Sequence, residues 1–258
     1  MLGVNRGAES NYLAAVREQL RAVLDERVIG VYAGGSYALG DYLPGRSDLD
    51  IAVVVPDPLS QDRAEAAVSE LRHESLPCPA RRLELVVYLA ETARSGSAAP
   101  DFELNLNSGA SSPLSAQRSG DPGDVGGHWF AIDRSILSQA GVALFGPPAG
   151  EVFAPIPLEE LTPVLIESLR WHREHTAEPS DAVLNACRAL RFAEDELWAS
   201  KPAAGRWAVE KNLAPEDLVA QALTARTHEA AIDAADVAVF LRGVESRLRQ
   251  GFGGLGTL

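Results

Sequence analysis

The chain has 258 residues, of which 46% are apolar, and a formal net charge of −13. This length and apolar content allow one sizeable core or two modest ones. The excess of acids disfavours nucleic acid as a partner, because affinity for nucleic acids rests on Lys and Arg contacts to phosphates. No apolar run approaches membrane length and the first residues lack a signal-peptide pattern, so we expect a cytoplasmic protein with no membrane contact. We also expect a monomer.

The first part of the chain interleaves strand and helix signals. Apolar spacing predicts a helix over 11–26, and apolar runs predict strands over 28–33, 49–55 and 82–89, with a helix over 59–72 between the last two. Residues 108–127 are rich in Ser, Gly, Pro and Asp, which predicts a long loop. A helix over 130–140 and a short strand within 142–148 follow. This order predicts an α/β (α+β) domain with a small mixed sheet over 1–153.

A Pro-rich stretch at 154–157 marks a boundary, and the pattern beyond it is helical almost throughout. We expect an all-α helical bundle over 154–250, and a flexible Gly-rich tail over 251–258. Asp181 is a good N-cap residue, and Pro215 suits a first helical turn. The expected helices of the bundle are 158–174, 181–200, 207–212, 215–226 and 230–249.

Residues 31–55 carry the strongest chemical signal. A short apolar strand leads into Gly34-Gly35-Ser36, and about a dozen residues later Asp48 and Asp50 open a second apolar strand. Glycine lets backbone N–H groups approach a phosphate closely, and a serine hydroxyl adds a donor. Two acids at i and i+2 on a strand share one face and repel each other unless a cation lies between them. Mg²⁺ prefers one or two carboxylates together with substrate phosphates, so the stretch predicts a metal–phosphate site.

A third acid follows on the next predicted strand, where Glu84 is flanked by Leu83 and Leu85. An acid inside an apolar strand is rarely a plain surface residue. Glu84 can complete a carboxylate cluster with the two aspartates and act as a general base with a raised pKa. The structural alternatives are a solvated edge strand and an ion pair with Arg82.

The Gly-Ser turn followed by Asp-x-Asp resembles the signature of the nucleotidyltransferase superfamily. The further order, through Val142-Ala-Leu-Phe-Gly-Pro into a helical bundle, resembles the aminoglycoside adenylyltransferases that modify spectinomycin and streptomycin. The resemblance implies that Asp48 and Asp50 hold Mg²⁺, joined by Glu84, which also acts as catalytic base. The nucleotide-binding residues that it implies in this part of the chain are Gly35, Ser36 and Ser47.

The resemblance also implies that the helical bundle contributes cations to the nucleotide, namely Arg188 and Lys201. A triphosphate needs more positive charge than Mg²⁺ supplies, which suits two such side chains. The structural alternative for Arg188 is an ion pair on its own helix with Glu194 or Asp195.

The region after the first bundle helix departs from the family pattern. Streptomycin-accepting members carry a tryptophan at the end of that helix and an aspartate a few residues on. In this chain direct alignment puts Trp171 one position early, with His172 in its place, and offers Glu174 or Glu178 rather than an aspartate. The candidates for substrate binding are Trp171, His172 and Glu178, with plain helix packing as the alternative for Trp171. The departure favours spectinomycin over streptomycin.

We therefore expect Mg²⁺-dependent transfer of AMP from the co-substrate ATP to a hydroxyl of a small cationic amino-sugar antibiotic, with release of pyrophosphate. One alternative is a nucleotidyltransferase that acts on a protein, an RNA or another metabolite. The other is a nucleotide-binding module without catalysis, which the combination of Asp48, Asp50 and Glu84 argues against.

Overall fold

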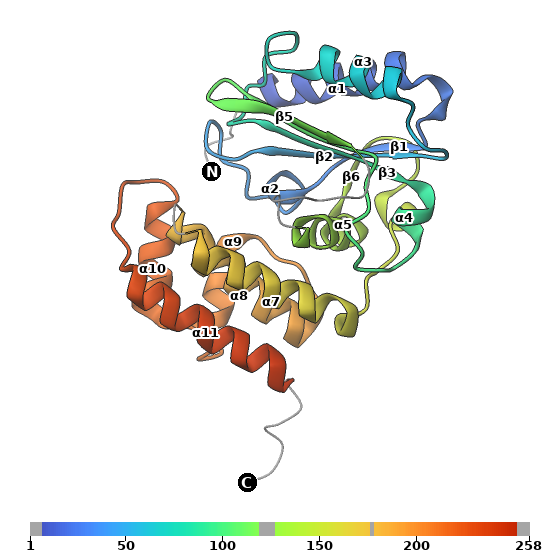
Figure 1. The fold of residues 1–258 in the computed structure, drawn as a ribbon. Coiled ribbons are helices and arrows are strands. Elements are labelled where there is room, and N and C mark those ends of the chain that lie inside the picture. Colours follow the sequence, from blue (N-terminus) through green and yellow to red (C-terminus); the bar gives the residue numbers. More distant parts are fainter. Residues whose placement is uncertain (1–6, 119–126, 176–177, 252–258) are drawn as a thin grey trace. The chain divides into compact units, whose positions relative to one another are not determined.

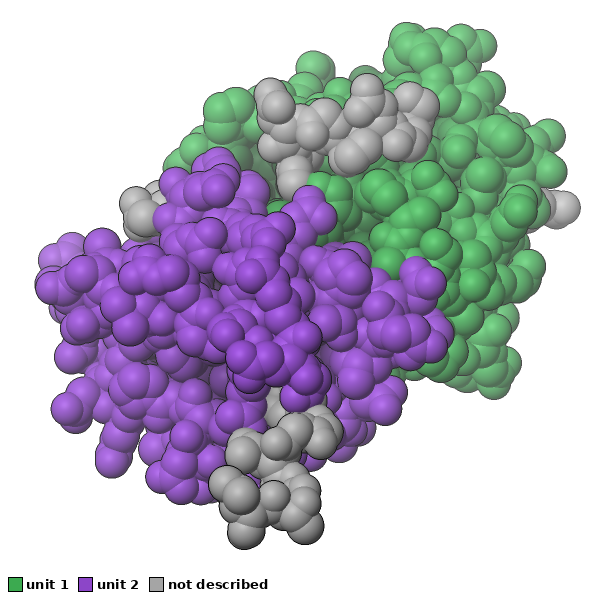
Figure 2. Space-filling view, turned by 60° about the horizontal axis from the view of Figure 1, so that its bottom comes forward, with its two compact units in different colours: residues 1–155 green, residues 156–258 purple. Residues whose placement is uncertain are grey.

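The computed structural model describes residues 7–118, 127–175 and 178–251. The chain divides into two compact units, which Figure 2 shows in different colours. Unit 1 comprises Met1–Pro155 and unit 2 comprises Ile156–Leu258. The division between residues 155 and 156 falls within the Pro-rich stretch 154–157, after which the sequence becomes helical in pattern. Most of the expected tail, residues 252–258, lies outside the described residues.

Unit 1 is built on one six-stranded sheet with the strand order β5-β4-β3-β2-β1-β6. β2 and β3 are parallel and the other neighbours are antiparallel, so the predicted mixed sheet is confirmed. The strands are β1 (Gly30–Ala33), β2 (Leu49–Val55), β3 (Leu83–Leu89), β4 (Leu104–Gly109), β5 (Ser112–Arg118) and β6 (Val142–Phe145). The helices of this unit are α1 (Gly7–Leu24), α2 (Gly35–Ala38), α3 (Gln61–Leu71), α4 (Ala90–Arg94), α5 (His128–Ala140) and α6 (Ala149–Val152), with a short 3₁₀ turn over Asp25–Arg27.

The two faces of the sheet bury different apolar sets. Figure 1 shows α1 and α3 along one face, with α4 and α5 on the other. The α1/α3 face buries alternate strand residues such as Ile51, Leu85 and Leu106. The opposite face buries an aromatic group that includes Tyr32, Tyr88 and Phe153. Because β2 is covered on both sides, its residues from Ile51 to Val55 are apolar without alternation.

The expected loop over 108–127 is wrong in its first half. That part forms the end of β4 and the whole of β5, which pair as an antiparallel hairpin from Leu104↔Arg118 to Gly109↔Ser112. β5 is an edge strand whose central residues are exposed, so it has little need of apolar side chains. The composition of β5 therefore resembles that of a loop, which explains the wrong prediction. Residues 119–126 lie outside the described residues.

A buried arginine ties α4 and its following loop to α5. Arg134 is 2% exposed, and its guanidinium donates to the carbonyls of Phe130 at 3.3 Å, Thr92 at 3.0 Å, Ser97 at 3.1 Å and Ala99 at 2.5 Å. Four carbonyl groups thus accept hydrogen bonds from one side chain, although the carbonyl of Thr92 also accepts one from the Ser95 hydroxyl at 3.0 Å.

We expect Arg134→Met to lower the free energy of unfolding by about 3 kcal/mol or more, because each buried carbonyl left without a donor costs about 1–3 kcal/mol. Urea unfolding of the full chain measures the change. Arg94→Met on the exposed side of α4 is the matched control and is expected to change stability by less than about 0.5 kcal/mol. Equal stability of the two variants would contradict this role.

Unit 2 is a helical bundle, as the sequence predicted. Its helices are α7 (Leu158–Glu174), α8 (Pro179–Asp195), α9 (Lys201–Glu210), α10 (Glu216–Ala225) and α11 (Ala234–Gln250). α8 begins two residues before Asp181, so Asp181 lies in its first turn and the expected N-cap is wrong. α8 also ends at Asp195, because Glu196 adopts a left-handed conformation with φ of 52°, and Ser200 then caps α9. Among the described residues, no helix combines the length and apolarity that a membrane span requires.

One buried carboxylate on α11 receives three arginines. Glu245 is 8% exposed, and it pairs with Arg170 at 2.8 Å and Arg173 at 2.8 Å from α7, and with Arg249 at 2.5 Å one turn along α11. Although burial acts to raise it, the pKa of Glu245 is lowered, because the hydrogen bonds and charges of the arginines favour the ionised form.

We expect Glu245→Gln to reduce the free energy of unfolding by about 2 kcal/mol near neutral pH, since the arginines are themselves partly solvated. A carboxyl group with a lowered folded-state pKa stabilises the fold above its unfolded pKa, and that contribution disappears as pH falls through the folded pKa. The difference between wild type and variant should therefore shrink between about pH 5 and pH 3. Denaturant unfolding at several pH values tests this, and a difference that grows on acidification would contradict it.

Candidate active site

The glycine-serine turn lies directly against the second strand of the predicted motif. Gly34 N–H donates to the carbonyl of Asp50 at 2.8 Å, which fixes the end of β1 against the start of β2. Gly35 has a φ of +49°, and a Cβ at this position would collide with the Asp50 carboxylate. Glycine is therefore required both by the left-handed backbone and by the close approach of the turn to the acid. Ser36 follows on α2.

The strand pairing brings the predicted acids together. β2 and β3 run parallel with Asp50 opposite Glu84, so both side chains leave the same face of the sheet. Asp48 lies two residues before Asp50, at the entrance to β2. Leu49 lies between the two aspartates and Leu83 directly precedes Glu84, and both leucines point into the core under α1 and α3. Because successive side chains of a strand point to opposite faces, the acids lie on one face of the sheet and the leucines on the other.

This concentration of carboxylates changes the protonation of Glu84. Burial, the charges of Asp50 and Asp48 and a hydrogen bond to Asp50 together raise the pKa of Glu84 to about 8, against the lowering effect of Arg82. A carboxyl group whose pKa lies this close to neutral pH can act as a general base.

Two arginines at the start of β3 contact these acids. Arg81 forms a two-pronged ion pair with Asp48, with Nε 2.8 Å from Oδ1 and Nη2 2.6 Å from Oδ2. Arg82 Nε lies 3.4 Å from Asp48 Oδ2, and its Nη2 also pairs with Glu84. The ion pair between Arg82 and Glu84 that the sequence offered as an alternative is therefore present, within the same carboxylate cluster. The involvement of Arg81 was not predicted from the sequence, although this residue lies only two positions before β3.

The acids at the start of β2 can be compared with the ligands that a divalent metal ion needs. Among residues 7–118, 127–175 and 178–251, no group of three or more His, Cys, Asp or Glu side chains is arranged to hold a metal ion. Mg²⁺ takes one or two carboxylates and completes its shell with phosphate oxygens and water. Asp48 and Asp50 would provide those two carboxylates. Their charges add to burial in raising the pKa of the neighbouring Glu84, and a bound cation would offset them. The residues fit the ion.

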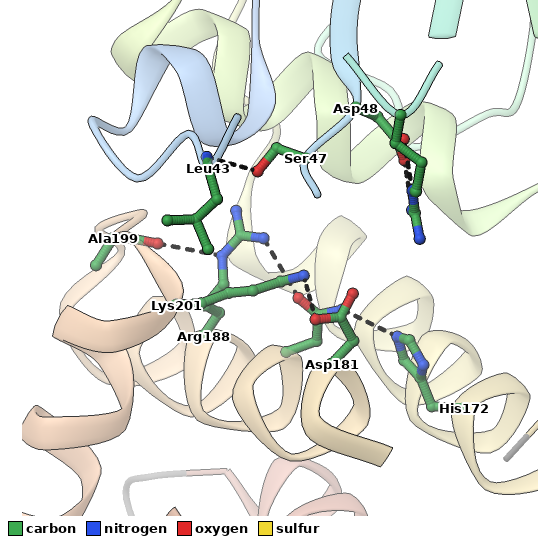
Figure 3. Close-up of polar contacts among 10 residues, drawn as sticks. Leu43, Ser47, Asp48, His172, Asp181, Arg188, Ala199 and Lys201 are labelled. Atoms are coloured by element: carbon green, nitrogen blue, oxygen red, sulfur yellow. Dashed lines mark hydrogen bonds and ion pairs between the residues drawn. The ribbon is translucent and has the colours of Figure 1, made fainter. Parts of the chain in front are cut away.

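Ser47 belongs to a closed loop before the acids. Its Oγ accepts a hydrogen bond from Leu43 N–H at 3.0 Å, and its own N–H donates to the Leu43 carbonyl at 2.9 Å (Figure 3). A hydroxyl that accepts one bond still has its hydrogen to donate. The loop therefore holds the predicted phosphate ligand Ser47 next to Asp48.

In unit 2, the predicted cations lie in a polar cluster on α8 and α9 (Figure 3). Lys201 Nζ is 2.8 Å from Asp181 Oδ1, and this pair keeps the pKa of Asp181 below its ordinary value although burial acts to raise it. Arg188 Nε donates to the carbonyl of Ala199 at 3.1 Å and its Nη1 contacts Asn185 Oδ1 at 3.4 Å. The expected alternative partner Asp195 lies instead 3.9 Å from Arg191.

The three candidate substrate residues are placed differently. His172 is 6% exposed, its Nε2 is 3.1 Å from Asn185 Nδ2, and burial lowers its pKa to about 4. Trp171 is half-buried and stacks on His175, with ring centroids 4.4 Å apart. Glu178 is exposed and occupies the N-cap position of α8, without a side-chain capping hydrogen bond. One feature of the sequence could have predicted the polar cluster of unit 2. Its three members on α8, Asp181, Asn185 and Arg188, are spaced at i, i+4 and i+7 and therefore share one face of the helix.

The chain is similar in fold to a solved enzyme structure and matches two known domain families. No curated protein sequence matches the chain. Among solved structures, the spectinomycin adenyltransferase AAD(9) from Enterococcus faecialis, determined with ATP and spectinomycin, is similar with a TM-score of 0.70 and 17% sequence identity. The similarity covers 93% of this chain and 99% of that chain, so the two share a fold.

Two family models match consecutive parts of the chain. Residues 16–96 match the nucleotidyltransferase domain, which spans the Gly-Ser turn and all three acids. Residues 151–241 match the C-terminal domain of aminoglycoside adenylyltransferases, which spans the helices of unit 2 up to the middle of α11. The chain therefore joins a nucleotidyltransferase domain to a C-terminal domain of the aminoglycoside adenylyltransferase kind.

Proposed function

We propose that this protein transfers AMP from ATP to a hydroxyl group of an aminoglycoside or aminocyclitol antibiotic and releases pyrophosphate. The observation that carries the proposal is the in-register pair of Asp50 and Glu84, with Asp48 beside it, inside a nucleotidyltransferase domain. The C-terminal domain match gives the substrate class, and the similar enzyme determined with ATP and spectinomycin supports the nucleotide and the drug.

The reaction needs one proton acceptor and one displaced group. Glu84 takes the proton of the acceptor hydroxyl, whose oxygen then bonds to the α-phosphorus of ATP. The bond from that phosphorus to the oxygen bridging to the β-phosphate breaks, and pyrophosphate leaves on the opposite side. The raised pKa of Glu84 suits this step, because a stronger base competes better for a hydroxyl proton.

We propose that Asp48 and Asp50 hold Mg²⁺ together with phosphate oxygens, with Glu84 as the third acid of the cluster. When bound, the ion neutralises charge on the phosphates and on the developing pyrophosphate. Asp48 accepts two hydrogen bonds from Arg81, which orient its carboxylate at the entrance to β2. Asp50 is held at the end of the Gly34–Gly35 turn.

The triphosphate itself is proposed to bind to Gly35, Ser36 and Ser47 of unit 1 and to Arg188 and Lys201 of unit 2. Gly35 has the backbone freedom that a close phosphate contact needs. The hydrogen bonds of Arg188 and the ion pair of Lys201 hold both long side chains in defined positions, which lowers the entropy lost when they bind phosphate.

For the amino sugar, Glu178 and Trp171 are the proposed contacts, since one is an exposed acid and the other a half-buried aromatic ring. An exposed carboxylate attracts a cationic amine. His172 is buried, so we propose that it acts through Asn185, whose side chain it contacts. Spectinomycin is the favoured substrate because the tryptophan and aspartate positions typical of streptomycin-accepting members are not matched.

The test is a drug-susceptibility panel of cells that express the chain or its Glu84→Gln variant. The proposal predicts resistance to spectinomycin with the wild-type chain, and sensitivity with the variant at equal expression. Resistance that survives in the variant, or equal susceptibility of cells with and without the wild-type chain across the whole amino-sugar panel, would contradict it.

A further inference from the structure

A row of polar side chains crosses the sheet at the level of Glu84. Asp50 on β2 is opposite Glu84 on β3, Glu84 is opposite Asn107 on β4, and Asn107 is opposite Ser115 on β5. Residues directly opposite each other on neighbouring strands project from the same face. The row therefore continues the acidic cluster by two further strands, past the proposed base.

This row is not needed to pack the sheet. The residues on either side of it along β3 and β4, Leu83, Leu85 and Leu106, point to the opposite face and are fully buried there under α1 and α3. Asn107 is half-buried, and asparagine is depleted in strands because its side chain competes with the backbone for hydrogen bonds. A polar amide at this point of a central strand calls for a reason other than stability.

The amide of Asn107 has a defined orientation. Its Nδ2 donates to Oδ1 of Asn105 at 3.2 Å, and Asn105 is itself buried at 5% exposure two residues along the same strand. With Nδ2 turned along β4 toward Asn105, the side-chain oxygen of Asn107 points away from that neighbour. A carbonyl oxygen in this position accepts hydrogen bonds from hydroxyl or ammonium groups.

The chemistry at Glu84 places the acceptor on this side. The metal-binding acids and the phosphate-binding turn lie on β2 and at the end of β1, on one side of Glu84. In-line displacement requires the attacking oxygen to approach opposite the leaving pyrophosphate. Neighbouring strands lie about 4.8 Å apart, so Asn107 is one strand spacing from Glu84 on the side away from Asp50.

We propose that Asn107 binds the acceptor, with its side-chain oxygen accepting a hydrogen bond from a hydroxyl or ammonium group of the amino sugar next to the hydroxyl that Glu84 deprotonates. Ser115, one strand further out and exposed, extends the same surface. This role rests on the proposed function, because it presumes an acceptor rich in hydroxyl and amine donors.

The experiment compares Asn107→Leu, which keeps the size but removes the oxygen, with Asn107→Asp, which keeps an accepting oxygen. Steady-state kinetics with spectinomycin and ATP are measured for both, with thermal unfolding as the check on folding. We expect Asn107→Leu to raise KM for spectinomycin about tenfold, the effect of one lost hydrogen bond, and to leave KM for ATP within about twofold. Asn107→Asp should keep KM for spectinomycin near the wild-type value, whatever its effect on kcat.

Asn11→Leu, the same chemical change on the exposed side of α1, is the matched control and should change neither constant. An Asn107→Leu variant that folds and retains the wild-type KM for spectinomycin would overturn the inference, as would equal rises in KM for spectinomycin and for ATP. If the wild-type protein modifies no amino sugar, the proposed function itself fails and this role of Asn107 with it. That outcome is distinct, because it is seen before any variant is made.

Discussion

Replacement of Glu84 by glutamine is expected to lower the rate of AMP transfer by at least about a hundredfold, and up to about ten-thousandfold, the range that a positioned general base contributes. Glutamine keeps the length and shape of the side chain but cannot take the hydroxyl proton. Binding of ATP should change far less than the rate, because the phosphate-binding turn and the two aspartates remain in place and only the third acid of the cluster is neutralised. Rapid-quench kinetics with labelled ATP measure the chemical step directly.

The control for this variant is Glu91→Gln, the same change at an exposed position of α4. It should leave both the rate and the affinity for ATP unaltered. Glu84 also pairs with Arg82, so thermal unfolding of the Glu84→Gln variant must show that the strand is intact. An intact variant with the wild-type rate would remove Glu84 from the mechanism.

Replacement of Asp50 by asparagine is expected to act on a different quantity. The carboxylate lies between the Gly35 turn and Glu84, where a neutral amide cannot offset the charge of a divalent cation. We expect the Mg²⁺-dependent part of ATP affinity to fall by about 100-fold, at the upper end of the losses seen when groups around a metal site are altered. Fluorescence titration of an ATP analogue with and without Mg²⁺ measures this part.

The matched control is Asp57→Asn just beyond the other end of β2, where the acid is exposed and 3.6 Å from Arg27. Its affinity for the nucleotide should respond to Mg²⁺ as in the wild type. If Asp50→Asn instead bound ATP with the same magnesium dependence as the wild type, the two aspartates would not form the metal site. The pair of variants thus separates metal binding, which Asp50 supports, from proton transfer, which belongs to Glu84.

Much of this site was predictable because its parts are local in sequence. The Gly-Ser turn and Asp-x-Asp are separated by only about a dozen residues. On a strand, Glu84 must project from the face opposite to that of its neighbours Leu83 and Leu85, which pack in the core. The prediction that Glu84 lies near Asp50 required the assumption that their strands are neighbours. The parallel pairing of β2 and β3 confirms that assumption. The change to a helical bundle after the Pro-rich stretch was also predictable, because the spacing of apolar residues becomes helical there.

What was missed depends on contacts between distant residues or on exposure. β5 has the composition of a loop because an edge strand needs few apolar side chains. The ion pairs of Asp48 with Arg81 and of Asp181 with Lys201 join different elements, and no local pattern specifies them. The burial of His172 and its contact with Asn185 on α8 likewise depend on the packing of two helices, which no local pattern specifies.

The most direct test of the proposed reaction follows the α-phosphate of ATP. The purified protein is incubated with Mg²⁺, spectinomycin and ATP labelled at the α-phosphorus, and the products are separated by thin-layer chromatography and identified by mass spectrometry. We predict a labelled spectinomycin–AMP adduct with one equivalent of pyrophosphate, and no adduct with Glu84→Gln. Label transferred to protein or RNA instead, or adduct formed equally by the variant, would contradict it.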